Sequence, residues 1–157
     1  VDFKTYPSTF TVHDRKTLNQ VNSVVIAFKH ESNEAKNIFF NPLFGLGSEF
    51  QTAEEYIFLR DSISSGLKVC FQPEIILTHA DYSSGKNHTS DAVIYARAAL
   101  FYKYSGILGY LRLIKHVIIV CSQANLSRVQ ILKKIRVGLN GISQFKRLKI
   151  NRKLNKY

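Results

Sequence analysis

An α/β fold is the prediction for this chain of 157 residues, and two patterns in the sequence lead to it. The first 90 residues alternate short β-branched runs with polar or helix-forming segments, as chains that mix strands and helices do. From residue 91 onward, apolar residues recur at helical spacing with lysine and arginine between them. We therefore expect a mixed sheet with helices in residues 1–90 and a basic helical extension in residues 91–157.

The beginning of the chain predicts little regular structure before one clear strand. Residues 1–20 are polar and mixed, which favours loop with one strand. Residues 23–28 (SVVIAF) form a β-branched run of the length of a strand. Residues 30–36 are polar and predict a short helix or turn. The following segment, residues 38–47 (IFFNPLFGLG), is an apolar loop whose glycines allow the backbone to approach a neighbouring molecule closely.

The clearest helix opens at residues 52–55 (TAEE). Thr52 can cap this helix and Glu55 can complete a capping box, and apolar residues then repeat at spacings of three and four as far as Gly66. Residues 67–71 and 75–78 predict two further strands, and Pro73 breaks the chain between them.

Three helices are predicted in the second part of the chain. They cover residues 91–104, 106–121 and 127–140, with breaks at a Ser-Gly pair and at a polar segment. The end of the chain, from Phe145, is rich in lysine and arginine and is expected to fray.

Charge is distributed very unevenly along the chain. Residues 1–91 hold 8 basic and 11 acidic residues, whereas residues 92–157 hold 14 basic residues and no acidic one. A basic segment such as residues 92–157 indicates an anionic partner or a solvated surface, and nucleic acid and anionic membrane are the usual partners. The two cysteines are too few for a disulfide framework or a zinc site, which favours a reduced compartment. No stretch has the roughly 18 apolar residues of a membrane span.

An ordered series of features occupies residues 40–79 (FNPLFGLGSEFQTAEEYIFLRDSISSGLKVCFQPEIILTH). It runs from an aromatic and glycine-containing loop through a pair of adjacent acids at a helix start, a strand and a proline to a histidine that ends the next strand. In this order and spacing, the series resembles the second half of a family 2 glycosyltransferase domain, which has the GT-A fold. SVVIAF resembles the preceding strand, and residues 96–106 (ARAALFYKYSG) resemble the helical tail of bacterial members. The resemblance covers roughly residues 20–115 and implies a partial GT-A-like mixed sheet.

The chain departs from the family pattern in three ways. Phe40-Asn41-Pro42 stands where an aromatic residue followed by Asp-Glu is usual, and Glu55 stands where Asp is common. The family's metal-binding Asp-x-Asp and its nucleotide-binding half precede the matched pattern, and residues 1–20 supply neither. We therefore expect the donor-binding half to be missing from this chain and the isolated chain to be inactive.

The resemblance assigns roles to particular residues. It implies that Glu55 is the catalytic base of an inverting transfer and that Glu54 tunes this base or contacts the acceptor. Gly45, Gly47 and Ser48 would border the acceptor, and His79 would be a metal ligand beside acids supplied upstream. It further implies a nucleotide-sugar donor, a glycan or lipid-linked acceptor, and Mn or Mg as the divalent metal in the intact enzyme of a bacterial surface-polysaccharide pathway. The expected location is the cytoplasm, at the inner face of the cytoplasmic membrane.

Each assignment has a plainer alternative. Glu54 and Glu55 can serve only the positive end of a helix, Gly45 and Gly47 can simply form turns, and an isolated His79 is usually a surface residue. The basic residues 92–157 can contact an anionic membrane or can be a solvated face of packed helices. For the whole chain, the alternatives are a non-catalytic remnant or a basic module that binds membrane or nucleic acid, although the tail has no zinc-finger or RNA-binding signature.

Overall fold

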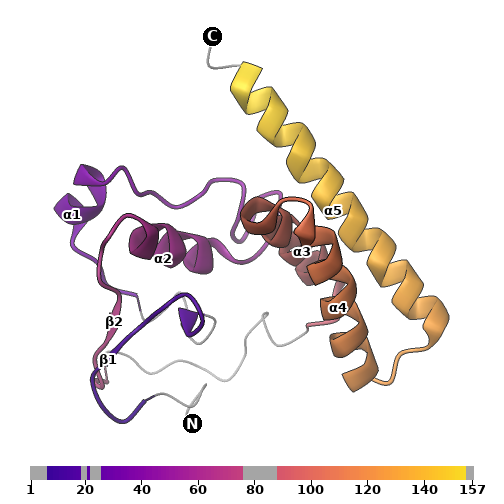
Figure 1. Ribbon diagram of the computed structural model, residues 1–157, viewed down its shortest axis with the longest axis horizontal. Coiled ribbons are helices and arrows are strands. Elements are labelled where there is room, and N and C mark those ends of the chain that lie inside the picture. The colour runs from indigo at the N-terminus through magenta and orange to yellow at the C-terminus, as the bar shows by residue number, and fades with distance from the viewer. Residues whose placement is uncertain (1–6, 19–20, 22–25, 76–87, 155–157) are drawn as a thin grey trace. The chain divides into compact units, whose positions relative to one another are not determined.

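The protein is mixed α/β and mostly helical. The computed structural model describes residues 7–18, 21, 26–75 and 88–154, with side chains as far as residue 151. These residues contain five helices and one two-stranded antiparallel sheet (Figure 1). The α/β prediction is therefore confirmed at the level of class.

The chain divides into two compact units. One, here called the sheet unit, comprises Val1–Pro42 and Glu54–Ser83. The other, here called the helical unit, comprises Leu43–Ala53 and Ser84–Tyr157. The loop Leu43–Ala53 thus leaves the sheet unit between its two segments and packs with helices that follow much later in the sequence.

The sheet unit contains β1 (Thr11–Val12) and β2 (Cys70–Phe71), which pair antiparallel. Thr11 faces Phe71 and Val12 faces Cys70, and a hydrogen bond from the His13 N–H to the Val69 carbonyl (2.8 Å) continues the pairing. At the opposite end, beyond Phe71, Pro73 has no N–H to donate and a turn closes between Gln72 and Glu74, so the pairing stops there.

The larger mixed sheet that the sequence predicts is not present in the described part of the chain. A strand among residues 1–20 and one within residues 67–71 are confirmed, although each is only two residues long. Residues 26–28 of the predicted strand 23–28 belong to no strand, and its other residues lie outside the described ranges. The same holds for the predicted strand 75–78, of which only residue 75 is described.

Two helices complete the sheet unit, α1 (His30–Ala35) and α2 (Glu54–Ser64). The second was predicted, and the first is the helical one of the two alternatives, helix or turn, expected for residues 30–36. The core of the unit gathers around the buried face of α2. Its fully packed members are Leu18, Ile38, Phe58 and Leu59. Burying side chains of this size contributes about 1.5–3 kcal/mol each, which makes the apolar face of α2 the main support of the unit.

The predicted capping box of α2 is wrong in its register. The helix begins at Glu54, so Ala53 directly precedes it and Thr52 lies one residue too early to be the cap. Ala53 has a φ of 76°, in the left-handed region, and this turns the chain sharply between Thr52 and the helix. The end of the helix agrees with the sequence, because Gly66 has a φ of 85° just beyond it.

The helical unit consists of α3 (Asp91–Ser105), α4 (Leu108–Gln123) and α5 (Arg128–Leu154), together with the loop. Figure 1 shows α3 and α4 lying against the long α5. The three predicted helices are confirmed. The core residues are apolar side chains with no exposed surface: Ile94, Ala98, Leu113, Val117, Cys121 and Ile142.

The prediction that the chain frays from Phe145 is wrong, because α5 continues to Leu154. Phe145 is buried, and its ring lies against those of Phe44 and Phe50 in the loop, with centroids 6.1 and 6.0 Å away. This contact extends the core by a further turn of α5, which the basic composition of the segment conceals. No helix among the described residues has both the length and the apolar content to cross a bilayer.

Candidate functional site

The two acids that the sequence singles out, Glu54 and Glu55, occupy the first turn of α2. Both side chains are half-exposed, so they can reach solvent or a bound molecule. The first turn also carries the free N–H groups and the positive end of the helix dipole, which favours two carboxylates at this place. The arrangement therefore presents adjacent carboxylates at a defined point on the surface of the sheet unit.

Packing holds α2, and with it the acid pair, in position. Ile57, Phe58 and Leu59 come two to four residues after Glu55 and are buried. The ring of Phe58 stacks on Phe40, with centroids 4.3 Å apart and planes within 6° of parallel, and lies 5.0 Å from the ring of Phe28. Aromatic pairs of this kind contribute about 0.5–1.5 kcal/mol beyond the area they bury. The first turn of α2 is thus connected directly to the best-packed region of the sheet unit.

The glycine loop forms a closed turn of its own backbone. Gly45 donates its N–H to the Phe50 carbonyl (2.8 Å), and Phe50 donates its N–H to the Leu43 carbonyl (2.9 Å). Gly45 and Gly47 have φ values of 117° and 79°, which side-chain-bearing residues adopt only with strain. A Cβ on Gly47 would meet no atom within 4 Å. Backbone conformation, and not crowding, is therefore the reason for glycine at position 47.

The hydroxyl of Ser48 is directed into this loop. Its Oγ lies 2.7 Å from the Gly45 carbonyl and 3.1 Å from those of Leu43 and Phe50. The single hydroxyl proton can be donated to only one of these oxygens at a time. Ser48 thus stabilises the turn. To contact an acceptor as predicted, its hydroxyl would have to give up its hydrogen bond to a backbone carbonyl and form one with the acceptor instead.

Aromatic packing joins the loop to α3. Phe50 is completely buried, and its ring stacks on Tyr95 at 5.3 Å between centroids. The Tyr95 hydroxyl donates a 2.8 Å hydrogen bond to the carboxylate of Glu49. Burial, reinforced by this bond and by the nearby negative charge, raises the pKa of Tyr95 to about 12. Tyr95 is therefore protonated at neutral pH, and it fixes the position of an exposed acid that sequence reasoning did not single out.

The predicted site residues fall into different parts of the chain. Glu54 and Glu55 belong to the sheet unit, whereas Gly45, Gly47 and Ser48 belong to the helical unit. His79 lies outside the described residues. Glu54 and Glu55 lie next to each other, and Gly45, Gly47 and Ser48 lie in one loop. The described structure contains no single site that includes both the acids and the loop.

A metal site needs several converging ligands. Within the ranges that the structure describes, no three histidine, cysteine, aspartate or glutamate side chains gather closely enough to hold an ion. The two acids of α2 would supply two carboxylate groups, and each can bind a metal through one or both of its oxygens. The predicted ligand set, which includes His79 and acids outside this chain, stays a prediction.

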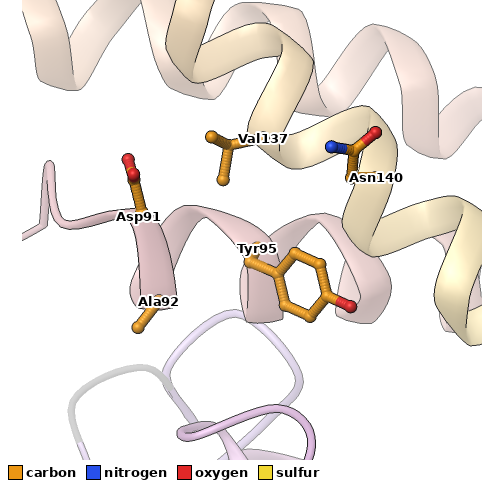
Figure 2. A pocket seen from close by; sticks show the side chains of 5 residues that line it. All are labelled: Asp91, Ala92, Tyr95, Val137 and Asn140. Atoms are coloured by element: carbon orange, nitrogen blue, oxygen red, sulfur yellow. The ribbon is translucent and has the colours of Figure 1, made fainter.

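A small open hollow lies between α3 and α5 (Figure 2). Asp91 at its edge accepts a 2.6 Å hydrogen bond from the ammonium group of Lys134, which forms an ion pair between the two helices. Asp91 is the last acid before the entirely basic part of the sequence, and this is the signal by which it could have been found. The hollow is also lined by Ala92, Tyr95, Val137 and Asn140. With its one carboxylate already paired, the hollow offers hydrogen-bonding groups but no base for catalysis.

His116 of α4 has a strongly shifted pKa. Burial, and after it electrostatic interaction with Arg97 and His88, lowers the pKa of His116 to about 4. Its Nε2 atom is buried without a hydrogen-bond partner in the described part of the chain, and its ring packs edge-on against Phe101, with centroids 5.5 Å apart. His116 is therefore neutral at pH 7 and acts as a packing residue.

Comparison of the chain with models of known protein families, with curated proteins and with solved structures gave no match.

Proposed function

We propose that this chain is the acceptor-side part of a family 2 glycosyltransferase of the GT-A type and that Glu55 is its catalytic base. The intact enzyme would transfer a sugar from a nucleotide-sugar donor to a glycan or lipid-linked acceptor at the cytoplasmic side of the membrane. The observation that carries the proposal is the acid pair in the first turn of a firmly packed helix. The ordered series of residues 40–79 supplies the family assignment.

The chemistry assigned to Glu55 is general base catalysis. As the acceptor hydroxyl oxygen attacks the anomeric carbon, its proton passes to the Glu55 carboxylate, and the bond from that carbon to the nucleoside diphosphate breaks with its electrons on the leaving oxygen. Attack from the face opposite the leaving group inverts the anomeric centre. A positioned base of this kind contributes about 10²–10⁴-fold to the rate.

Half-exposure of both acids supports this role, because a base must reach its substrate. Glu54 occupies the adjacent position and would bind the acceptor or adjust the proton affinity of Glu55. The closed turn at Gly45 and Gly47 supports the second part of the proposal, because a rigid loop that carries no side chain at position 47 can border a sugar closely. The divalent metal and the donor site belong in this proposal to the nucleotide-binding half.

The experiment that tests the proposal begins with the reading frame upstream of Val1. The prediction is a strand-helix-strand unit that ends in an Asp-x-Asp, and the whole enzyme should then transfer label from one of a panel of nucleotide sugars in the presence of manganese. The 157-residue chain alone should show no turnover. An upstream sequence without that unit, or turnover by the isolated chain, would contradict the proposal.

A further inference from the structure

The outward face of α4 is apolar although α4 already buries an opposite apolar face. Four residues at spacings of four, Gly109, Leu113, Val117 and Cys121, are buried against the rest of the helical unit. With 3.6 residues per turn, the outward apolar residues fall on the other side of the helix within an arc of less than half its circumference. They are Leu108, Leu111, Ile114, Ile118 and Ile119, with Ile107 just before the helix, and they are between 40% and 79% exposed. We call these six residues the outer row of α4.

An amphipathic helix of a globular domain normally has a polar outer face, because only one side packs on the core. Single exposed aliphatic residues are common on protein surfaces and require no explanation. Five on one face of a 16-residue helix, with Ile107 just before it, form an apolar surface interrupted only by Lys115, and such a surface marks a place where something else binds.

The charges around the outer row identify its partner. Arg112 and Lys115 are both exposed on the same helix. With 3.6 residues per turn, Arg112 lies at one edge of the row and Lys115 lies within its arc. Residues 92–157 contain 14 basic residues and no acid, so no carboxylate from this segment repels an anionic surface. An aliphatic row with one cation at its edge and a long lysine side chain within it is the composition of a helix that lies in the plane of an anionic bilayer interface.

Other partners fit the outer row less well. A symmetric contact with a second copy would bring Arg112 and Lys115 towards the same residues of that copy, which places like charges together. Arg112 and Lys115 could contact nucleic-acid phosphates too, but base recognition also needs polar groups or aromatic rings for stacking, and the aliphatic side chains of the row offer neither.

We propose that α4 is a membrane-docking helix, whose outer row inserts into the headgroup and acyl boundary of an anionic bilayer while Arg112 and Lys115 contact lipid phosphates. This inference goes beyond sugar transfer and does not depend on it, because it rests only on residues of the helical unit. It needs no spanning segment, since such a helix lies along the interface.

The test is co-flotation of the whole 157-residue chain with vesicles of phosphatidylcholine alone and with vesicles that also contain phosphatidylglycerol. The expected result is strong binding to the anionic vesicles, weak binding to the neutral ones and a decrease with added salt. Leu111→Ser combined with Ile118→Ser should lower partitioning into anionic vesicles by about tenfold or more, because two side chains no longer enter the apolar layer. Arg112→Gln combined with Lys115→Gln should also lower it on the order of tenfold, but only for anionic vesicles.

The matched control is Leu46→Ser combined with Ile75→Ser. It removes the same two residue types, from positions at 79% and 93% exposure that lie outside α4. This control should bind vesicles like the unchanged chain, and all three variants should keep the helical circular dichroism of the unchanged chain because their altered side chains face solvent.

A second measurement locates the contact. Cys121 is buried and Cys70 is exposed, so a Cys70→Ser background leaves no exposed cysteine among the described residues. A polarity-sensitive dye on Ile118→Cys in that background should shift to the blue with anionic vesicles, and a dye on Leu46→Cys should not.

Four results would overturn the inference. They are equal losses in the α4 and control variants, unchanged binding when the outer row is altered, self-association through α4 that excludes vesicles, and salt-sensitive nucleic-acid binding without vesicle binding. Slow labelling of Ile118→Cys in the absence of vesicles would also contradict it, because another part of the chain would then cover the row.

Discussion

Two glycines in α5 offer a controlled test of how closely the helices of the helical unit pack. Gly138 and Gly141 lie on the face of α5 that meets the other two helices. Replacing an interior helical glycine with alanine ordinarily stabilises a helix by about 1 kcal/mol. At Gly141, however, the new Cβ would fall on the carbonyl oxygen of Tyr95 and within 3.2 Å of that residue's Cα. These are backbone atoms of α3, and no change of rotamer can move them.

Gly138 is the matched comparison because its obstacle is a side chain. A Cβ there would fall on Cδ1 of Leu113 and lie 2.8 Å from Cδ2. Leu113 can rotate or shift its methyl groups, although at a cost, because it is completely buried. The same substitution thus meets a fixed obstacle at one site and an adjustable one at the other.

The magnitudes follow from two opposing terms. Overpacking costs about 1–3 kcal/mol and should reach the upper part of that range where backbone must separate from backbone. After subtracting the helix-propensity gain of about 1 kcal/mol, Gly141→Ala should destabilise the helical unit by about 1–2 kcal/mol. Gly138→Ala should change its stability by less than about 1 kcal/mol in either direction.

Urea unfolding followed by far-ultraviolet circular dichroism is the suitable assay, because most helical residues belong to α3, α4 and α5. The reasoning predicts a lower unfolding midpoint for Gly141→Ala, with the slope of the free energy unchanged. A Gly141→Ala protein as stable as the unchanged chain would refute the close approach of α5 to α3. A Gly138→Ala protein that loses more than Gly141→Ala would refute the distinction between backbone and side-chain obstacles.

Three further substitutions test the packing, capping and electrostatics of the helical unit. Leu113→Ala should cost about 3 kcal/mol of unfolding free energy, because it leaves a cavity in a fully buried core, and a loss below about 1 kcal/mol would place Leu113 outside that core. Ser90→Ala should cost about 1 kcal/mol, since the Ser90 hydroxyl accepts the Val93 N–H at the start of α3, and equal stability would show that the cap is not formed. His116 has a folded pKa of about 4 against an ordinary value of 6.5, so the unfolded chain binds its proton first and stability falls as the pH drops from about 6.5 towards 4. After allowance for partial exposure, the loss between pH 7 and pH 5 should be about 1 kcal/mol. His116→Phe should lack that part of the pH dependence, and an identical pH profile for the two proteins would contradict the assignment.

The helical unit was largely predictable because its determinants are local. Apolar residues repeat every three or four positions, and Gly106 and the polar segment before Arg128 separate the helices. The length of α5 was not predictable in the same way. Phe145 is followed by basic residues, and only its packing on Phe44 and Phe50, about 100 positions earlier, shows that the helix still belongs to the core there.

The sheet unit was less predictable because strand formation depends on partners distant in sequence. Residues 67–71 have strand composition, but only Cys70 and Phe71 form a strand, paired with Thr11 and Val12. The start of α2 differs from the predicted start at Thr52 for a local reason. Ala53 has a positive φ, a conformation that alanine rarely adopts and that its sequence context does not indicate.

The candidate site shows the same contrast. Adjacent acids at a helix start are a local feature, and the structure places Glu54 and Glu55 there as expected. The link between Glu49 and Tyr95 joins residues 46 positions apart and has no local signature. The outer row of α4 lies between these cases, since its aliphatic residues are visible in the sequence but their exposure is known only once the buried face of the helix is known.

The central claim is that Glu55 acts in catalysis and does not merely stabilise the start of α2. The most direct measurement compares kcat for Glu55→Gln and Glu31→Gln in the enzyme that includes its donor-binding half. Glu31 is the matched control, because it is an exposed glutamate in the first turn of α1. Both changes remove about 0.3–1 kcal/mol of helix-dipole stabilisation. The proposal predicts that Glu55→Gln lowers kcat by about 10² or more while Glu31→Gln leaves it unchanged. Equal and small effects of the two substitutions would contradict the claim and leave Glu55 as a residue of the helix start.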